Sequence, residues 1–237
     1  MTQTLPITLG VLRPDAQFLS KKKNDGPKPI FGAMPQEARL RVLERDNYTC
    51  ACCGFRSERY QDILFMDGNP ENHADNNVKT VCIFCHQCFH MDGIGAMRSG
   101  VLIWMPEISQ TDLHHIARAI YVARITQGPM ADAARSSLDK IMARREAAKE
   151  RILTDDPAVL ASVLKEYLEP KQYQRRGEKL DGIRLFPLDR RIIKEGGIEF
   201  NQFPQILAFW RSKAGPYGEM LPTNWLDYYR DTLGKAA

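Results

Sequence analysis

The spacing of apolar side chains predicts a mostly helical chain. Residues 131–153 and 157–168 repeat their apolar positions at the helical period, and Pro35 is a favourable first residue for a helix that ends near Asp46. Ser109 is a typical N-cap residue and starts another predicted helix. Behind it, one helix face carries four apolar residues: Leu113, Ile116, Ala117 and Ile120.

Short strands are predicted where apolar residues alternate or gather in brief runs. Leu5–Leu12 alternates apolar with polar or small residues, and Val101–Met105 is a compact run of β-formers. Residues 171–200 are expected to be basic and irregular, with a short apolar stretch, Ile183–Phe186, that ends at Pro187. Together with the helices, these runs predict an α+β fold that is predominantly helical.

Two Cys-x-x-Cys pairs predict a metal site. Cys50 and Cys53 form the first pair, and Cys82 and Cys85 form the second. Two such turns can hold one zinc ion from opposite sides, and four thiolates close a tetrahedron that leaves no open position for water. One structural Zn²⁺ is therefore predicted, and Gly54 suits the tight turn after the first pair.

Two cysteines, Cys52 and Cys88, are left over. Cys88 lies three residues after Cys85, so a Cys85/Cys88 pair is an alternative, but the Cys-x-x-Cys-His form favours Cys82 with Cys85. Cys52 and Cys88 are then expected to be small buried apolar residues.

Two adjacent histidines, His114 and His115, fall on the helix predicted behind Ser109. Neighbouring helical residues point about 100° apart, so one metal ion cannot easily bind both. We expect them to lie at the surface or at an interface.

Composition and charge narrow the possible functions. The chain is 43% hydrophobic, which is too high for a disordered protein. Its formal charge of +4 gives little support to a dedicated nucleic-acid binder. No apolar run approaches the roughly 20 residues that span a bilayer, and residues 1–10 lack the pattern of a secretory signal. A reducing, cytoplasmic location is expected, in which clustered cysteines favour metal over disulfides.

Four regions are predicted along the chain. Residues 1–34 form an N-terminal strand and basic loop, 35–108 form the zinc-binding module, and 109–169 form a helical region. Residues 170–237 form a basic linker and an aromatic C-terminal extension that is expected to pack on the same domain. The aromatic residues of the extension predict either a late satellite core or a surface for a partner.

Residues 42–90 resemble the HNH endonuclease module. The resemblance rests on Arg45–Cys50 before the first cysteine pair, Asp67–Asn72 between the pairs, and Cys85–His86 at the end of the second pair. It implies a β-hairpin followed by a helix (ββα), with a four-cysteine zinc site that makes the module rigid. In that family, nuclease chemistry uses a separate catalytic metal and a histidine base.

The catalytic pair of that family is replaced in this chain. In active members a His-His or Asp-His pair precedes the Asp-Gly-Asn turn, and the matching positions are Leu64 and Phe65, which neither bind metal nor accept a proton. The resemblance therefore implies no catalytic residue. His86 and His90 do match the family's helix ligands, and His73 lies nearby. An active endonuclease that uses His86, His90 and a divalent metal on DNA is the alternative.

A closer resemblance, over most of residues 42–187, is to the IcmJ/DotN family of type IVB (Dot/Icm-type) secretion systems. It is carried by Gln-Cys-Phe at 87–89, by Leu102–Leu113 and by Ile183–Pro187. The resemblance implies a non-catalytic, zinc-stabilised adaptor that binds the cytoplasmic C-terminal tail of the type IV coupling ATPase and other coupling-complex subunits.

This resemblance also implies a location and excludes a partner. The chain would be cytoplasmic and peripheral to the inner membrane through the complex, with no nucleic acid as a partner. A zinc-dependent DNA-binding protein without catalysis is a third hypothesis. A dedicated DNA-binding protein would show a basic stripe, and the residues of this chain that come closest to one are Lys21–Lys23 and Arg175–Arg176.

Overall fold

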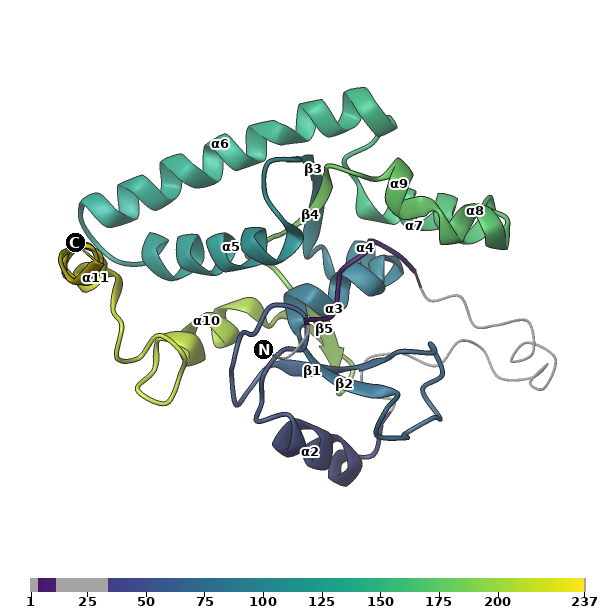
Figure 1. The fold of residues 1–237 in the computed structure, drawn as a ribbon, viewed down its shortest axis with the longest axis horizontal. Coiled ribbons are helices and arrows are strands. Elements are labelled where there is room, and N and C mark those ends of the chain that lie inside the picture. The colour runs from purple at the N-terminus through teal and green to yellow at the C-terminus, as the bar shows by residue number, and fades with distance from the viewer. Residues whose placement is uncertain (1–3, 12–33, 237) are drawn as a thin grey trace.

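The computed structural model describes residues 4–11 and 34–236, and Figure 1 shows its helices arranged around short pairs of strands. The helices are α2 (Gln36–Arg45), α3 (Ile83–Phe89), α4 (Ile94–Met97), α5 (Gln110–Arg124), α6 (Pro129–Ile152), α7 (Pro157–Glu166), α8 (Pro170–Gln174), α9 (Arg176–Lys179), α10 (Phe203–Arg211) and α11 (Trp225–Ala236), with 3₁₀ turns η1 (Met91–Gly93) and η2 (Pro222–Asn224). The strands are β1 (Gln61–Phe65), β2 (Val78–Cys82), β3 (Gly100–Trp104), β4 (Ile183–Pro187), β5 (Ile192–Glu195) and β6 (Ile198–Asn201). They pair in sequence order into two-stranded antiparallel sheets. The predicted α+β class is confirmed.

A β-hairpin followed directly by a helix occupies the middle of the chain. β1 and β2 pair from Gln61 opposite Cys82 to Phe65 opposite Val78, and α3 begins at the next residue. Helix α2 covers the hairpin through the buried side chain of Val42. The carboxylate of Asp46, just after α2, accepts a hydrogen bond of 2.9 Å from the backbone of Thr80. These contacts fix α2 to the hairpin.

The strands β3 and β4 bring distant parts of the chain side by side. Leu102 lies opposite Leu185, and both side chains are buried. Helix α6 packs on β3 and beside α5, as Figure 1 shows. The predicted N-cap of α5 is confirmed, since the side chain of Ser109 accepts a hydrogen bond from the backbone of Asp112. In the last turn of α5, the Tyr121 hydroxyl donates a hydrogen bond to the carbonyl of Pro187, at the end of β4.

The first part of the aromatic extension belongs to the main core. Phe203, Ile206 and Trp210 of α10 are buried there, and the Trp210 ring lies 5.7 Å from that of Phe84 in an edge-on contact. The expected satellite core was therefore wrong for these residues. Among the elements in contact with α11, η2 is the principal one, and Figure 1 shows α11 at the end of the molecule near the start of α6.

Two further predictions of secondary structure were wrong. The described residues 4–11 form no strand; they make isolated backbone bonds, from Leu5 to Ala51 and from Gly10 to Cys88. Residues 171–200 are not irregular, because they hold α8, α9, β4 and β5. These elements are too short to show a period, and β4 is held by pairing with a strand far away in sequence. Residues 21–23 lie outside the described part of the chain.

A close approach at Gly182 yields a stability test. Gly182 has φ +78°, and an added Cβ would lie 2.2 Å from the Trp104 ring. Gly196 also has a positive φ, +57°, but a Cβ there would meet nothing within 4 Å. We expect Gly196→Ala to cost about 1 kcal/mol from backbone strain, and Gly182→Ala to cost about 1–3 kcal/mol more from overpacking. Urea unfolding measures both, and equal losses would contradict the packing.

Candidate metal centre

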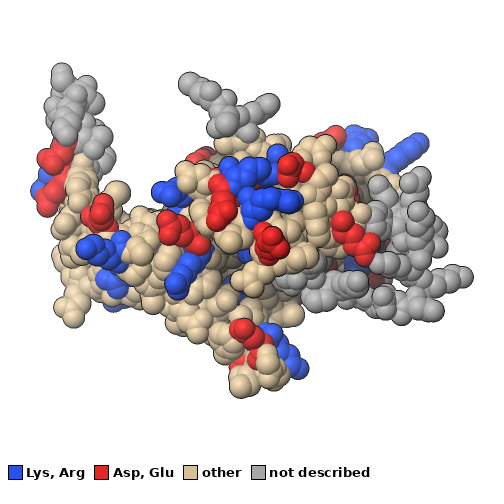
Figure 2. All heavy atoms as spheres, turned by 90° about the horizontal axis from the view of Figure 1, so that it is seen from below, with Lys and Arg blue, Asp and Glu red and all other residues tan. Residues whose placement is uncertain are grey.

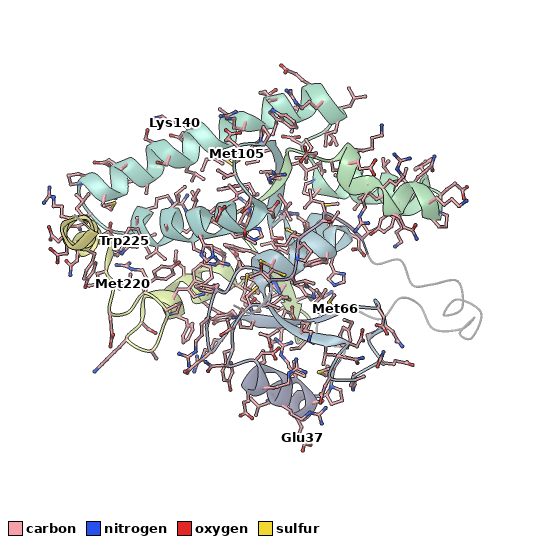
Figure 3. All side chains as sticks on the ribbon, in the orientation of Figure 1. Glu37, Met66, Met105, Lys140, Met220 and Trp225 are labelled. Atoms are coloured by element: carbon pink, nitrogen blue, oxygen red, sulfur yellow. The ribbon has the colours of Figure 1, made fainter. Side chains whose placement is uncertain are left out.

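The structure brings the four predicted cysteines together. Their Sγ atoms all lie within 4.8 Å of one another, and sulfur atoms gather beside α3 in the middle of the molecule (Figure 3). Cys50 and Cys53 come from the loop after α2, where Gly54 takes φ +71° and donates its amide to the carbonyl of Cys50. Cys82 is the last residue of β2 and the N-cap of α3, and Cys85 lies in the first turn of that helix.

The spacing of these sulfurs fits a metal with four thiolate ligands. A tetrahedral ion with metal–sulfur bonds of about 2.3 Å separates its sulfurs by about 3.8 Å. The Sγ atoms of Cys53 and Cys82 are 3.7 Å apart. Cys50, Cys82 and Cys85 are buried and Cys53 is half-buried, so the four thiols are poorly accessible to water. A closed site with no room for a reacting water is what this geometry offers.

Arg118 of α5 supplies a positive charge to the cluster. It is fully buried, and its Nη2 donates to the Sγ of Cys82 at 3.0 Å and of Cys53 at 3.3 Å. No carboxylate of the described residues forms an ion pair with Arg118. Burial opposes ionisation of both the Cys82 thiol and the Arg118 guanidinium. Even so, the neighbouring thiols and Arg118 lower the pKa of Cys82. In the same way, Cys82 raises the pKa of Arg118. A buried guanidinium without a carboxylate implies negatively charged sulfurs.

His114 forms a second contact with the cluster, and its hydrogen bonds define its tautomer. Gln110 is oriented by Leu185, whose amide donates to Oε1 and whose carbonyl accepts from Nε2. The same Gln110 Nε2 lies 2.9 Å from His114 Nε2, which must therefore accept. The proton then sits on Nδ1, 3.3 Å from the Sγ of Cys85. Burial lowers the pKa of His114 to about 3, so the ring is neutral.

The expectation of two surface histidines was half wrong. His115 is exposed, and its Nε2 lies 2.9 Å from the carbonyl oxygen of Cys53. His114 is fully buried, because α5 turns that side toward the sulfurs. Sequence reasoning also missed Gln110 and Arg118. The available signal was their spacing, since Gln110, His114 and Arg118 follow one another every four residues along the apolar side of the helix.

The two remaining cysteines are buried, as predicted. Cys88 lies outside the group of four sulfurs, and its thiol is 3.6 Å from the carbonyl oxygen of Phe84, to which it can donate. This position gives no support to the alternative Cys85/Cys88 pair. Cys52 interacts with Cys50 and Cys85 but also lies outside the group.

His86 lies in the middle of α3 and His90 is its C-cap, and their surroundings differ from those of the cysteines. Their rings are 4.4 Å apart and both are buried. Nδ1 of His86 lies 4.0 Å from the carboxylate of Asp62, which also pairs with Arg39 at 2.9 Å. Burial lowers the pKa of His86 against the attraction of Asp62, and burial and His86 lower the pKa of His90 to about 3. Both rings are therefore neutral at pH 7.

These histidines do not form a metal cluster with other residues. In the described ranges, the four cysteines are the one set of three or more potential ligands whose atoms lie within 4.8 Å. The guanidiniums of Arg39 and Arg191 both act on Asp62 and His86, and they disfavour a cation there. His73 instead lies 3.0 Å from the carbonyl of Pro70.

Leu64 and Phe65 are buried in β1, at the positions where the HNH resemblance expects catalytic groups. They line a cavity of about 210 Å³ together with His90, Asp67 and Tyr173. Their apolar side chains offer no ligand and no base to this cavity.

Comparisons with known proteins agree with the resemblance found in the sequence. No family model matches the chain. It is 31% identical over 128 residues to the type 4 apparatus protein DotN of Legionella pneumophila, a match that covers 52% of this chain and 60% of the relative. The predicted resemblance to the IcmJ/DotN family is thereby confirmed for about half of the chain. In the described part of the structure, no helix is both long and apolar enough to cross a membrane.

The buried carboxylate of Asp62 gives a pH-dependent prediction. Burial alone would raise its pKa, but His86, whose ring takes up a proton in acid, and the guanidinium of Arg39 lower it below its usual value. A lowered pKa stabilises the fold above about pH 4, and this contribution is lost as the pH falls toward the folded-state pKa. We expect Asp62→Asn to cost about 3 kcal/mol at pH 7 and less near pH 3.

Urea unfolding at the two pH values measures this effect. Asp75→Asn is the matched control, since that carboxylate is exposed and 3.7 Å from Arg45; it should change stability by less than about 0.5 kcal/mol. A pH-independent loss for Asp62→Asn would contradict the role of the charge.

Proposed function

We propose that this chain is a subunit of a type IVB (Dot/Icm-type) secretion apparatus and acts as a zinc-stabilised, non-catalytic adaptor. The observation that carries the proposal is the similarity to DotN, a type 4 apparatus protein. The match covers about 60% of the length of that relative. The partners and the role of this chain are therefore part of the proposal. The adaptor would bind the cytoplasmic C-terminal tail of the type IV coupling ATPase, alongside other subunits of the coupling complex.

Zinc is the metal that the cysteine cluster supports best. Four thiolates at tetrahedral spacing are typical of structural zinc, and soft sulfur ligands disfavour Mg²⁺ and Ca²⁺. The ion would be held by Cys50, Cys53, Cys82 and Cys85. When bound it would supply folding free energy, because the ligands are brought together only in the folded chain.

We interpret the hairpin and α3 as an HNH-like module that has lost its catalytic pair. Its order of elements, hairpin then helix, is the order that the sequence resemblance implied. Buried Leu64 and Phe65 in place of the catalytic pair, and neutral histidines beside two guanidiniums, argue for a scaffold without nuclease chemistry.

Exposed apolar side chains support a protein partner. Val159 and Val163 of α7 and its C-cap residue Tyr167 follow one another every four residues, and their exposed fractions are 49%, 41% and 76%. A second group lies at the C-terminal end, where Met220 and Trp225 are labelled in Figure 3: Met220, Leu221, Leu226 and Tyr228. Exposed apolar groups of this kind are typical of interaction surfaces. Such a subunit would be cytoplasmic and reach the inner membrane only through its complex.

Charge on the surface gives little support to a DNA-binding role. On the face shown in Figure 2, basic and acidic side chains are interspersed rather than gathered in a stripe. Of the basic residues singled out in the sequence, Arg175 pairs with Glu178 at 2.9 Å, and Arg176 donates to the carbonyls of Leu9 and Tyr173. No nucleic acid is therefore included among the proposed partners.

The adaptor role predicts binding that depends on the zinc ligands. Purified wild-type chain should carry about one zinc per molecule and bind a peptide that covers the coupling ATPase tail. Cys50→Ser should lose most of the zinc and weaken tail binding by about tenfold or more, because the rigid module is lost. Cys88→Ala is the matched control, a buried cysteine outside the cluster, and should keep both properties. Metal analysis and calorimetry measure them, and a zinc-loaded wild type that binds no segment of the tail would overturn the adaptor role.

The nuclease alternative has a direct test. Wild-type protein with its zinc intact should leave supercoiled plasmid DNA uncut in Mg²⁺, Mn²⁺ or Ni²⁺, since neither a base nor an open metal position is available. Nicking that disappears in His90→Ala would establish the endonuclease instead.

A further inference from the structure

Helix α5 presents a polar row to the cysteine cluster. Gln110, His114 and Arg118 lie four residues apart, and all three are buried. Two of them contact the proposed metal ligands directly: His114 contacts Cys85, and Arg118 contacts Cys53 and Cys82. The third, Gln110, orients His114. Three of the four ligands thus receive a hydrogen bond from one helix.

Charge balance gives Arg118 a particular role in this row. One Zn²⁺ and four thiolates leave a net charge of −2 in a buried place, which is costly unless it is compensated. Among the described residues, Arg118 is the cation that contacts these sulfurs. Its single positive charge halves the excess, and its Nη2 group serves two ligands at once. The neutral N–H of His114 adds a hydrogen bond without a charge.

Arg118 also connects the cluster to the C-terminal part of the chain. Its guanidinium lies over the Phe55 ring, 4.0 Å from the centroid. The same ring contacts Trp210 at 5.6 Å and Tyr217 at 6.4 Å. Trp210 is in α10 and Tyr217 follows it, and the amide of Tyr217 donates to the carbonyl of Trp210 at 2.9 Å. A continuous line of contacts therefore runs from the sulfurs to segment 203–217.

We propose that Arg118 is a positioning residue: the counter-ion of the zinc–thiolate centre, through which zinc occupancy holds segment 203–217 in place. The inference rests on the zinc site of the proposed function, but not on the identity of any partner. With the metal bound, the sulfurs are charged and attract the guanidinium. The guanidinium in turn holds Phe55 in place, together with the side chains of Trp210 and Tyr217 that contact it. Without the metal, the attraction weakens and the segment loosens.

The first experiment measures zinc release to a colorimetric chelator from wild type, Arg118→Met, Arg118→Lys and Arg124→Met. Arg124 is the matched control on the same helix, since it stacks on Tyr121 and pairs with Asp189 away from the sulfurs. We expect about 10–100-fold weaker zinc retention for Arg118→Met, an intermediate loss for Arg118→Lys, and no change for Arg124→Met. Release from Arg118→Met within about twofold of wild type would overturn the inference alone, whereas wild type without zinc would overturn the zinc site as well.

A ligand exchange separates charge from packing. Cys53 is half-buried, so a histidine there replaces a thiolate with a neutral ligand and lowers the excess charge by one. We expect Arg118→Met to weaken zinc retention less in a Cys53→His background than in wild type, because less negative charge needs compensation. Strictly additive effects would mean that Arg118 only packs against Phe55, and would overturn the counter-ion role.

The coupling to the C-terminal segment has its own readout. Hydrogen exchange of the amides in 203–217, including that of Tyr217, should become about tenfold faster or more in Arg118→Met and in wild type stripped of zinc. Arg124→Met should exchange at the wild-type rate. Unchanged protection of this segment after zinc removal would overturn the coupling, even if zinc retention depends on Arg118.

Discussion

The contact between the four cysteine sulfurs and the guanidinium of Arg118 is the constraint on which the rest of the structure depends. The sulfurs come from the loop after α2, from the end of β2 and from the first turn of α3, while Arg118 comes from α5. One cluster therefore joins the hairpin to the helical layer. A buried guanidinium costs several kcal/mol unless an opposite charge lies beside it. The guanidinium is therefore best compensated while the sulfurs are ionised, and a metal ion, when bound, would keep four adjacent thiolates ionised.

Along α3, charge balance distinguishes the proposed metal site from a pair of histidines that resembles one. At the first end, one guanidinium faces several sulfurs, so the surroundings favour a cation among them. Farther along the helix, Arg39 and Arg191 act on the single carboxylate of Asp62, and His86 and His90 are neutral at pH 7. A divalent cation placed there would meet more positive than negative charge. Two histidines at helical spacing are thus insufficient evidence for a metal, even directly after the second cysteine pair of the four-sulfur cluster.

Short sequence patterns predicted those elements of the fold that depend mainly on neighbouring residues. The capped helix behind Ser109, the strand at 101–105 and the four clustered cysteines could all be found because each carries a short, specific signal. The N-terminal segment was wrong because alternation alone cannot provide a pairing partner, and its backbone bonds only at isolated points. His114 and Arg118 were missed because polar side chains on a helix are usually solvated, and only the tertiary contact with the sulfurs explains their burial.

Structural metal binding and nuclease chemistry make opposite physical demands, so one can be present without the other. A catalytic metal needs an open position, a base and access for water, whereas a structural zinc needs closure and exclusion of water. Leu64 and Phe65 meet the second set of demands, since both are buried in β1 and each contributes about 2 kcal/mol by removing apolar surface from water. Apolar residues at these two positions therefore have a structural effect of their own. They stabilise the hairpin that carries Cys82 into the cluster.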